Sequence, residues 1–279
     1  MSMTNLPPAL AENERARLAL AMARESGRLL TTAFWHGATT ENKRQGSYDP
    51  VTEADRAAER LLRKRIKAAF PQDGLLGEEF GGEAENAEYV WVLDPIDGTR
   101  SFVCGLPGWT TLIAVLHEET PVLGLVHHPL TEMTVIGDGH SCWRIVNGSV
   151  ERVRTRATTR LADALAGTTL PHLYLEDPGG RRFLETMMRR ARHVQFDGDA
   201  LFYAMVACGR MDVAFDTGLA PHDAAALAPI IEGAGGMFSS WQGRARPSAG
   251  NVLACASAEL HREILELLRQ TGAADISGQ

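Results

Sequence analysis

The chain has 279 residues, of which 44% are hydrophobic and 23% are charged, a composition typical of a globular protein rather than a disordered one. Its formal net charge of −7 disfavours a surface that binds nucleic acid or anionic membrane. The sequence shows no membrane span, no signal-peptide pattern and no cysteine spacing for zinc or disulfides, so we expect a cytoplasmic protein.

Two helices are predicted at the start of the chain. Residues 9–34 carry apolar side chains at helical spacing among charged ones, which indicates one long amphipathic helix. Thr52 and Asp55 have the spacing of a capping box, which predicts a second helix that runs to Phe70. On this pattern alone, Asp55 could serve only as a helix cap.

The segment from Tyr89 to Leu93 is a run of apolar and aromatic residues, which indicates a buried strand. Pro95 lacks an N–H group, so we expect the strand to end at Asp94 and a turn to bring Asp97 back beside it. Two neighbouring carboxylates repel each other, and a hard cation, Mg²⁺ before Ca²⁺, would relieve that repulsion. The alternative is an ordinary Asp-Pro turn at the surface.

Residues on either side of this turn could complete a site. The Ile96 carbonyl could face the same cation, and the N–H groups of Gly98 and Thr99 could face an anion if they open a helix. Glu78 lies only sixteen residues before Asp94 and could share its metal, although paired acids before glycines also suit a solvated turn.

Later segments predict more strands and two further acidic positions. Residues 109–117 and 121–128 indicate a hairpin and residues 131–136 a third strand, so we expect an antiparallel or mixed sheet. Asp199 and Asp223 each stand at the start of a predicted helix, where an aspartate can be either a cap or a ligand.

Four segments together resemble the inositol monophosphatase family. They are Val51 to Asp55, Gly77-Glu78-Glu79, Trp91 to Thr99, and His222 to Ala225. The resemblance implies one domain over residues 10–272, with lobes of about 10–150 and 151–272, in an α/β (α+β) layered α/β/α/β/α sandwich. It also implies Mg²⁺-dependent hydrolysis of a small phosphomonoester and a homodimer. Haloacid dehalogenase phosphatases place their two aspartates two apart, whereas Asp94 and Asp97 are three apart.

Within the family, three segments are similar to the histidinol-phosphate phosphatases: Gly198 to Ala200, Gly218-Leu219, and Asp223 to Gly236. Inositol-phosphate enzymes usually carry a small uncharged residue at the position of Asp199. Two positions depart from the pattern, because Asp216 stands where glutamate is usual and His222 where an aromatic residue is frequent.

The resemblance assigns roles to these positions. Glu78, Asp94 and the Ile96 carbonyl would hold one Mg²⁺, and Asp94, Asp97 and Asp223 a second, with a third, weaker ion near Glu78. Thr99, alone or with Asp55, would orient the attacking water, with Glu78 as the third catalytic residue. The predicted substrate-binding residues are Ile96, Asp97, Gly98, Thr99, Gly198, Asp199, Asp216 and Asp223.

Two other functions stay open at this stage. One is a related phosphatase that acts on inositol phosphates, sugar phosphates or nucleotide 3′-phosphates. The other is a regulatory scaffold without activity. Release of phosphate in the presence of Mg²⁺ would separate an enzyme from a scaffold.

Overall fold

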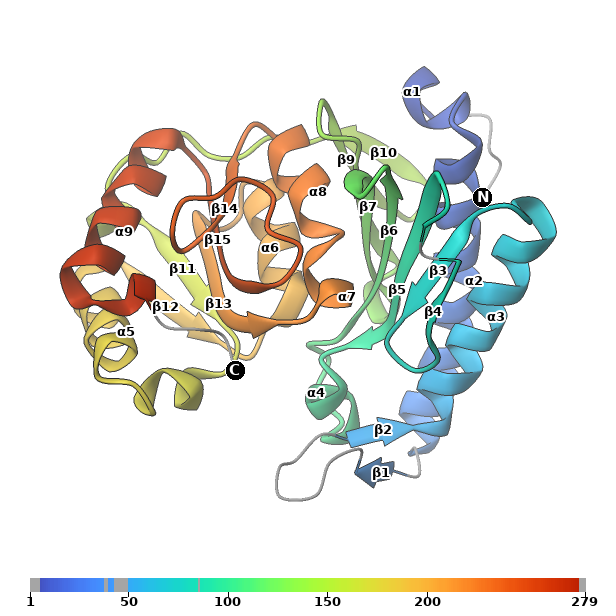
Figure 1. Ribbon diagram of the computed structural model, residues 1–279, viewed down its shortest axis with the longest axis horizontal. Coiled ribbons are helices and arrows are strands. Elements are labelled where there is room, and N and C mark those ends of the chain that lie inside the picture. Colours follow the sequence, from blue (N-terminus) through green and yellow to red (C-terminus); the bar gives the residue numbers. More distant parts are fainter. Residues whose placement is uncertain (1–5, 38–39, 43–49, 85, 276–279) are drawn as a thin grey trace.

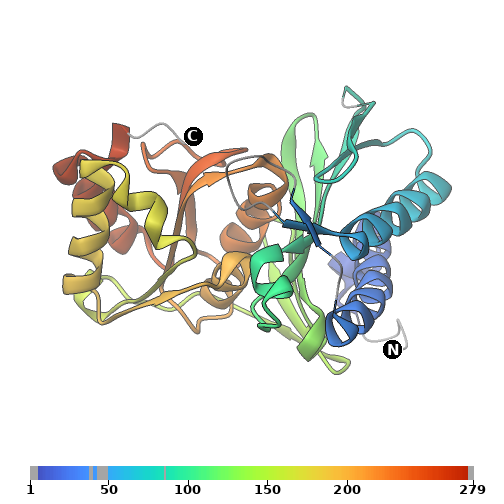
Figure 2. The ribbon, with the colours of Figure 1, turned by 90° about the horizontal axis from the view of Figure 1, so that it is seen from below.

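Two large β-sheets alternate with three layers of helices in the computed structural model (Figure 1), and β-strands near the N-terminus form a separate two-stranded sheet. The structure describes residues 6–37, 40–42, 50–84 and 86–275. In order across the molecule, the layers are helices α2 and α3, an eight-stranded sheet, helices α6 and α8, a five-stranded sheet, and helices α5 and α9 (Figures 1 and 2). This arrangement confirms the predicted α/β/α/β/α architecture.

The helices are α1 (Pro8–Ala11), α2 (Glu14–His36), α3 (Glu53–Ala69), α4 (Thr99–Val103), α5 (Pro178–Arg190), α6 (Asp199–Ala207), α7 (Pro221–Ala224), α8 (Leu227–Gly233) and α9 (Ala258–Thr271). The strands up to residue 152 are β1 (Thr40–Asn42), β2 (Pro50–Thr52), β3 (Gly74–Gly77), β4 (Gly81–Glu83), β5 (Tyr89–Asp97), β6 (Thr110–His117), β7 (Thr120–His128), β8 (Met133–Gly137), β9 (Cys142–Val146) and β10 (Ser149–Arg152). The later strands are β11 (Leu165–Thr168), β12 (His193–Phe196), β13 (Val213–Leu219), β14 (Met237–Ser240) and β15 (Gly250–Cys255).

Both large sheets are mixed, as predicted. The eight-stranded sheet has the order β10-β9-β8-β7-β6-β5-β3-β4, and only the pair of β3 with β5 is parallel. The five-stranded sheet has the order β12-β11-β13-β15-β14, in which β11 is parallel to both of its neighbours. The predicted domain limits of 10 and 272 and the lobe boundary near residue 150 stay predictions.

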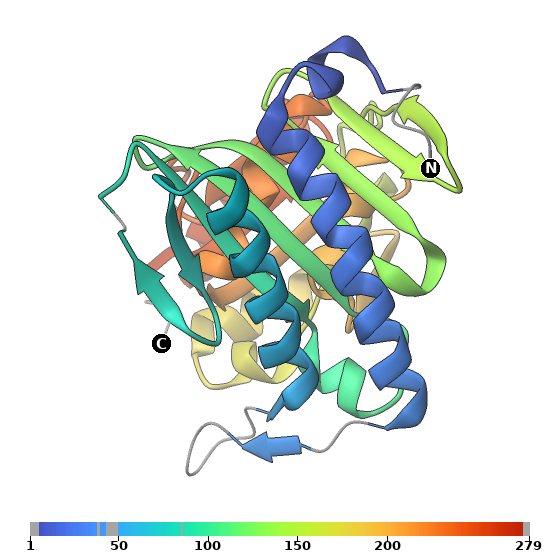
Figure 3. The ribbon, with the colours of Figure 1, turned by 90° about the vertical axis from the view of Figure 1, so that its right-hand side faces the viewer.

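Three of the four apolar clusters among the described residues hold the layers together. Helices α2 and α3 lie side by side across the outer face of the eight-stranded sheet (Figure 3) and share one core with it. Helices α6 and α8 share a second core with the inner faces of both sheets, and α5 and α9 cover the far face of the five-stranded sheet. Among the described residues, no helix is both long and apolar enough to cross a membrane.

The N-terminal helix differs from its prediction. Residues 9–34 do not form one helix, because α1 ends at Ala11 and α2 begins at Glu14. The Asn13 side chain accepts a hydrogen bond from the Ala16 N–H at 3.0 Å, so it caps α2 and separates the two helices. The predicted capping box of Thr52 and Asp55 is confirmed at the start of α3.

Strand β5 also differs from its prediction, because it does not stop at Asp94. Asp94 pairs with Leu112 and Asp97 pairs with Thr110, so β5 has one more residue than β6 between these pairs. Such an extra residue is a β-bulge, and the missing N–H of Pro95 is tolerated inside it. The Thr111 hydroxyl donates to the Pro95 carbonyl at 2.8 Å. The strand therefore continues to Asp97.

Two paired glycines let the α8 segment lie directly on the eight-stranded sheet. Gly124 on β7 pairs with Gly137 on β8. A Cβ atom on Gly124 would stand 2.0 Å from the Ala226 carbonyl oxygen, and one on Gly137 would stand 2.4 Å from that of Pro229. Neither position has room for a side chain. These two glycines therefore determine how closely the chain that follows Asp223 approaches the sheet.

We expect Gly124→Ala to destabilise the protein, because the backbone of Ala226, rather than a flexible side chain, occupies the space that the added methyl group would need. Overpacking of this kind typically lowers the free energy of unfolding by about 1–3 kcal/mol. Val122 lies on the same strand at 36% exposure, and Val122→Ala should stay within about 0.5 kcal/mol of the wild type. Urea unfolding measures both, and equal stability of the two variants would contradict the tight packing.

Candidate active site

Three aspartates meet where β5 approaches α7. Asp94, Asp97 and Asp223 each offer a carboxylate oxygen, and these oxygens lie within 4.8 Å of one another. Asp94 precedes the bulge of β5 and Asp97 follows it, while Asp223 comes from α7, which packs against β5 (Figure 1). The bulge thus does what was predicted for a turn, since it brings Asp97 beside Asp94.

Glu78 joins this cluster from the end of β3. Gly77 pairs with Leu93 in the parallel ladder, and the Glu78 N–H continues that pairing with a 3.1 Å bond to the Leu93 carbonyl. Since Leu93 directly precedes Asp94, the two acidic residues are neighbours. A hydrogen bond between their side chains contributes to raising the pKa of Asp94.

The cluster is electrostatically costly without a cation. Burial raises the pKa of Asp94 well above its usual range, and the charges of Glu78, Asp97 and Asp223 raise it further. Burial, followed by the charges of Asp199 and Asp223, does the same to the pKa of Asp97. Burial also raises the pKa of Asp223, while nearby His222 lowers it. A bound cation would relieve both the desolvation and the repulsion.

The donor set fits a hard metal ion. Asp94 is 1% exposed, and its Oδ1 atom finds no hydrogen-bond partner in the part of the chain that the structure describes. A buried carboxylate oxygen without a donor is costly unless an ion binds it. Clustered carboxylate oxygens suit Mg²⁺ or Ca²⁺, and soft ligands are absent from the described cluster.

Asp97 is held by donors from both sides of the molecule. Its Oδ2 atom accepts from the Thr110 hydroxyl at 3.1 Å and from the backbone N–H of Ala200 at 2.8 Å. Ala200 lies in the first turn of α6, so this carboxylate satisfies one N–H group at a helix start. Asp97 therefore connects the eight-stranded sheet to α6.

Gly98 and Thr99 follow at the start of α4. Gly98 has a φ of 86°, and a Cβ atom there would stand 2.8 Å from Asp199 Oδ2, so only glycine fits. The Thr99 hydroxyl donates to the Ile96 carbonyl at 2.9 Å. That carbonyl keeps a second lone pair, so a metal contact through Ile96 is compatible with this bond.

Asp199 is the first residue of α6, and its interpretation as the helix cap is wrong. Gly198, not Asp199, is the N-cap residue of α6, and the Ala200 N–H is bound by Asp97. The Asp199 N–H donates to the Thr169 hydroxyl at 3.0 Å. Burial, then the charges of Asp216 and Asp223, raises the pKa of Asp199 to about 7, against an opposing effect of Arg100.

Asp216 lies close enough to Asp199 for its charge to raise the pKa of Asp199, but it is outside the carboxylate cluster. It is 4% exposed, and both of its carboxylate oxygens bind internal donors. Oδ1 accepts from the Thr169 N–H at 2.7 Å and the Thr168 hydroxyl at 3.1 Å, and Oδ2 accepts from the Tyr203 hydroxyl at 2.9 Å. Burial raises its pKa to about 6 even though these bonds lower it. Its direct contact with a substrate stays a prediction.

Two further predicted residues have visible local roles. Asp55 is fully buried, and its Oδ2 atom accepts from the Thr52 N–H at 2.8 Å as part of the capping box. Its partnership with Thr99 stays a prediction. Gly198 lies against the Phe202 ring, which a Cβ atom would meet at 2.2 Å. A larger residue at Gly198 would displace that ring and the start of α6.

Sequence reasoning missed the residues that orient these acids. They are Thr110 and the Ala200 N–H at Asp97, Thr169 and Tyr203 at Asp216, and Glu59 near Glu78. Most carry no local signal, because their partners are distant in the chain. Glu59 had one, since a Glu59–Arg63 pair on the otherwise apolar face of a helix is unusual.

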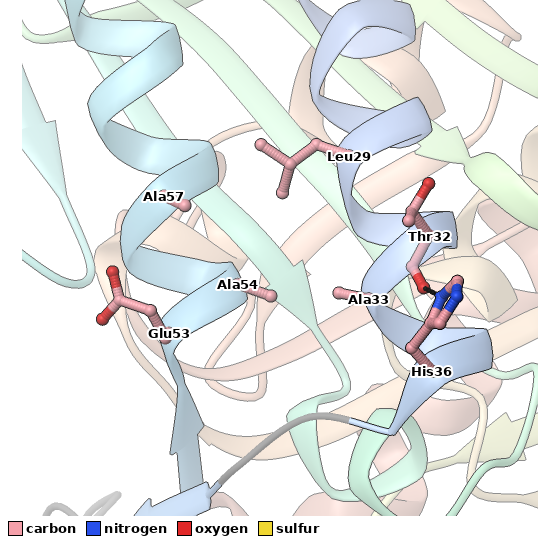
Figure 4. Close-up of a pocket in the computed structure, with 7 residues that line it drawn as sticks. All are labelled: Leu29, Thr32, Ala33, His36, Glu53, Ala54 and Ala57. Atoms are coloured by element: carbon pink, nitrogen blue, oxygen red, sulfur yellow. Dashed lines mark hydrogen bonds between the residues drawn. The ribbon is translucent and has the colours of Figure 1, made fainter.

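A separate groove of about 360 Å³ lies between α2 and α3 and does not contain these acids (Figure 4). Its lining is mostly apolar, and His36 there bonds the Thr32 carbonyl at 2.8 Å. The residues that line it are Leu29, Thr32, Ala33, His36, Glu53, Ala54 and Ala57. The carboxylate cluster, not this groove, has the chemistry of an active site.

Comparison with known proteins identifies the family of the chain. The family model for the inositol monophosphatase family matches residues 12–273. A histidinol-phosphatase of Chlorobaculum parvum is 36% identical, with 89% of this chain and 94% of that protein covered. A fructose-1,6-bisphosphatase/inositol-1-monophosphatase of Thermotoga maritima is 30% identical, with 92% and 96% covered. The solved structure of a T. maritima IMPase superposes with a TM-score of 0.82 at 28% identity, covering 94% of this chain and 99% of that one. The chain therefore belongs to the inositol monophosphatase family and is a metal-dependent phosphoric monoester hydrolase.

Proposed function

We propose that this enzyme hydrolyses L-histidinol phosphate to L-histidinol and phosphate, with Mg²⁺ as its cofactor. The observation that carries the proposal is Asp199, a carboxylate that stands against Gly98 and beside the cluster of Asp94, Asp97 and Asp223. Histidinol phosphate carries an ammonium group and an imidazole, and both favour a carboxylate partner. Inositol is neutral and offers only hydroxyl groups, so a buried carboxylate would find no cationic partner on it.

The metal would be held by the residues of the carboxylate cluster. Glu78, Asp94 and the Ile96 carbonyl would form one set of ligands, and Asp94, Asp97 and Asp223 a second, with two or three ions in all. Bound Mg²⁺ would supply Lewis acidity, a lowered pKa for water and charge neutralisation of the phosphate. The clustered oxygens of the three aspartates support this assignment.

The remaining residues would bind and orient the reactants. The Thr99 hydroxyl donates its hydrogen bond to the Ile96 carbonyl, so its oxygen can accept a hydrogen bond from the attacking water and orient it. Gly98 and Thr99 would donate N–H groups to the phosphate. Attack by water forms one P–O bond as the P–O bond to the alcohol breaks, and the proton that the water gives up balances the proton that the departing alkoxide takes from solvent. Gly198, Asp199, Asp216 and Asp223 would surround the alcohol.

The second candidate is an inositol-1-phosphatase or a related sugar-phosphate or nucleotide 3′-phosphatase. Relatives named for inositol phosphates and relatives named for histidinol phosphate match this chain at similar identity. This similarity supports an inositol phosphate or related ester as the alternative substrate. A phosphate-release screen with histidinol phosphate, inositol 1-phosphate and 3′-phosphoadenosine 5′-phosphate tests the choice. The predicted homodimer, the cytoplasmic location and the absence of nucleic-acid partners stay predictions.

Replacement of Asp94 tests the metal site. We expect Asp94→Asn to lower turnover more than tenfold, because the variant loses the ligand common to both metals. Without metal the variant should be at least as stable as the wild type, since one repelling charge is removed. Mg²⁺ should raise the melting temperature of the wild type but not that of the variant.

Thermal melts with and without Mg²⁺, together with phosphate release, provide the measurement. Asp163→Asn is the control, because it removes one charge from a side chain that is 54% exposed and far from the cluster in the chain. A variant of Asp94 that keeps a tenth of the activity would exclude the bridging role.

Replacement of Thr99 tests the orientation of water. Thr99→Val keeps the shape of the side chain but removes the hydroxyl, and we expect kcat to fall about 100-fold or more with little change in KM. Thr99→Ser retains a hydroxyl and should recover most of the activity. If Thr99→Val changes KM alone, Thr99 binds phosphate and another group orients the water.

Replacement of Asp199 tests the substrate. Asp199→Asn preserves shape and removes charge, so kcat/KM for histidinol phosphate should fall roughly tenfold or more, the scale of a charge-assisted hydrogen bond. Hydrolysis of glycerol 2-phosphate, the ester of a neutral alcohol, should change less than about twofold. Equal losses on the two substrates would refute recognition of the ammonium group and favour the second candidate.

A further inference from the structure

A buried ion pair on α3 lies next to the site but outside the carboxylate cluster. Glu59 is fully buried, and Arg63 is 7% exposed one helical turn later. The Arg63 Nε atom donates to Glu59 Oε1 at 2.7 Å. Buried ion pairs are seldom more stable than apolar side chains of the same size. The pair therefore calls for a reason other than stability of the core.

The Glu59 carboxylate binds the turn that carries Glu78. Gly77 pairs with Gly81, so residues 78–80 form a three-residue hairpin turn between β3 and β4. Glu59 Oε2 accepts from the Glu79 N–H at 2.7 Å, and Oε1 accepts from the Phe80 N–H at 3.3 Å. The carboxylate also presses on Gly77, whose Cβ atom, if present, would lie 2.0 Å from Oε1.

Arg63 completes the hold on the same hairpin. Its guanidinium donates to the Gly81 carbonyl and, at 3.2 Å, to Glu83 Oε1. Arg63 therefore restrains the Glu59 carboxylate, and the contacts with β4 restrain Arg63. The Glu59–Arg63 pair thus attaches the β3–β4 hairpin to α3.

Glu78 is consequently fixed from two sides. On one side its N–H bonds the Leu93 carbonyl, next to Asp94. On the other side its two successors in the chain are bound to Glu59. The backbone at Glu78 therefore has little freedom to move away from Asp94.

We propose that Glu59 is a positioning residue that sets the affinity of the carboxylate cluster for its divalent cation. Glu59 acts through Glu78. Because the turn that carries Glu78 is already ordered, less of the binding free energy of the ion is lost in ordering that turn. The inference rests on the metal-dependent function proposed above, but not on the identity of the substrate.

The test compares two glutamate-to-glutamine changes, one on α3 and one on the β3–β4 hairpin. Glu59→Gln removes the charge that binds Arg63 and replaces one acceptor oxygen by an NH₂ group, which cannot accept from the turn. Glu83→Gln is the matched control, because it removes the other carboxylate that contacts Arg63 and leaves the bonds to Glu79 and Phe80 intact.

Mn²⁺ binding, followed by electron paramagnetic resonance, reports affinity without any turnover, and Mg²⁺ activation curves report it in the working enzyme. We expect Glu59→Gln to weaken Mn²⁺ binding and to raise the activating Mg²⁺ concentration about tenfold, with kcat at saturating Mg²⁺ within about threefold of the wild type. Glu83→Gln should leave both values within about twofold, even if its melting temperature falls.

The outcomes separate the inference from the proposed function. If Glu59→Gln melts earlier but binds Mn²⁺ as the wild type does, Glu59 only stabilises the hairpin and the inference is wrong. If the wild type binds no Mn²⁺, both the metal site and the inference fail. If the wild type hydrolyses another ester and Glu59→Gln still weakens the metal, the inference stands and the histidinol phosphate proposal fails.

A variant of Arg63 covers the case in which Glu59→Gln does not fold. Arg63→Lys keeps a positive charge beside Glu59 but cannot reach both Glu59 and Gly81, so the turn is held more loosely. It should weaken Mn²⁺ binding about threefold or more. Unchanged binding in a folded Arg63→Lys protein would overturn the inference.

Discussion

The repulsion among carboxylates at the end of β5 is the constraint around which the other parts of the site are arranged. Asp94, Asp97 and Asp223 hold oxygens within 4.8 Å of one another, with Glu78 beside Asp94. Such an arrangement persists only if the surrounding backbone is rigid enough to resist it. A bulge fixes Asp97, a parallel ladder fixes Glu78, and the packing of Gly124 and Gly137 against the chain after Asp223 limits the movement of that segment.

Asp97 links this cluster to the second sheet. One of its oxygens binds the Ala200 N–H, so the start of α6 is anchored on the strand that carries the metal ligands. The same helix start carries Asp199, whose own N–H is held by Thr169, and Thr169 in turn binds Asp216. The group proposed to recognise the alcohol is therefore placed by the group proposed to hold the metal.

The sequence predicts those features of the site that arise from near neighbours in the chain. The meeting of Asp94 with Asp97 follows from their spacing, and the capping box of α3 from Thr52 and Asp55. It does not predict bonds between distant segments, such as Asp97 with Ala200 or Glu59 with Glu79. Asp199 shows the limit clearly: an aspartate at a helix start is normally a cap, but here a distant carboxylate already occupies the N–H group.

The buried acids of this protein fall into two kinds, and the difference separates structural from ligand-binding roles. Glu59 and Asp216 have backbone N–H, hydroxyl or guanidinium donors around them, so the fold itself compensates their burial. Asp94 instead faces other carboxylates and has an oxygen for which the described residues supply no donor. Asp212 also has one oxygen without a donor among the described residues, but its other oxygen forms an ion pair with Arg156 at 3.2 Å. Asp94 differs because its charged neighbours are carboxylates, and such a cluster is left to be neutralised from outside. The positive charge must then come with a ligand, and a divalent cation delivers it to all the carboxylates at once.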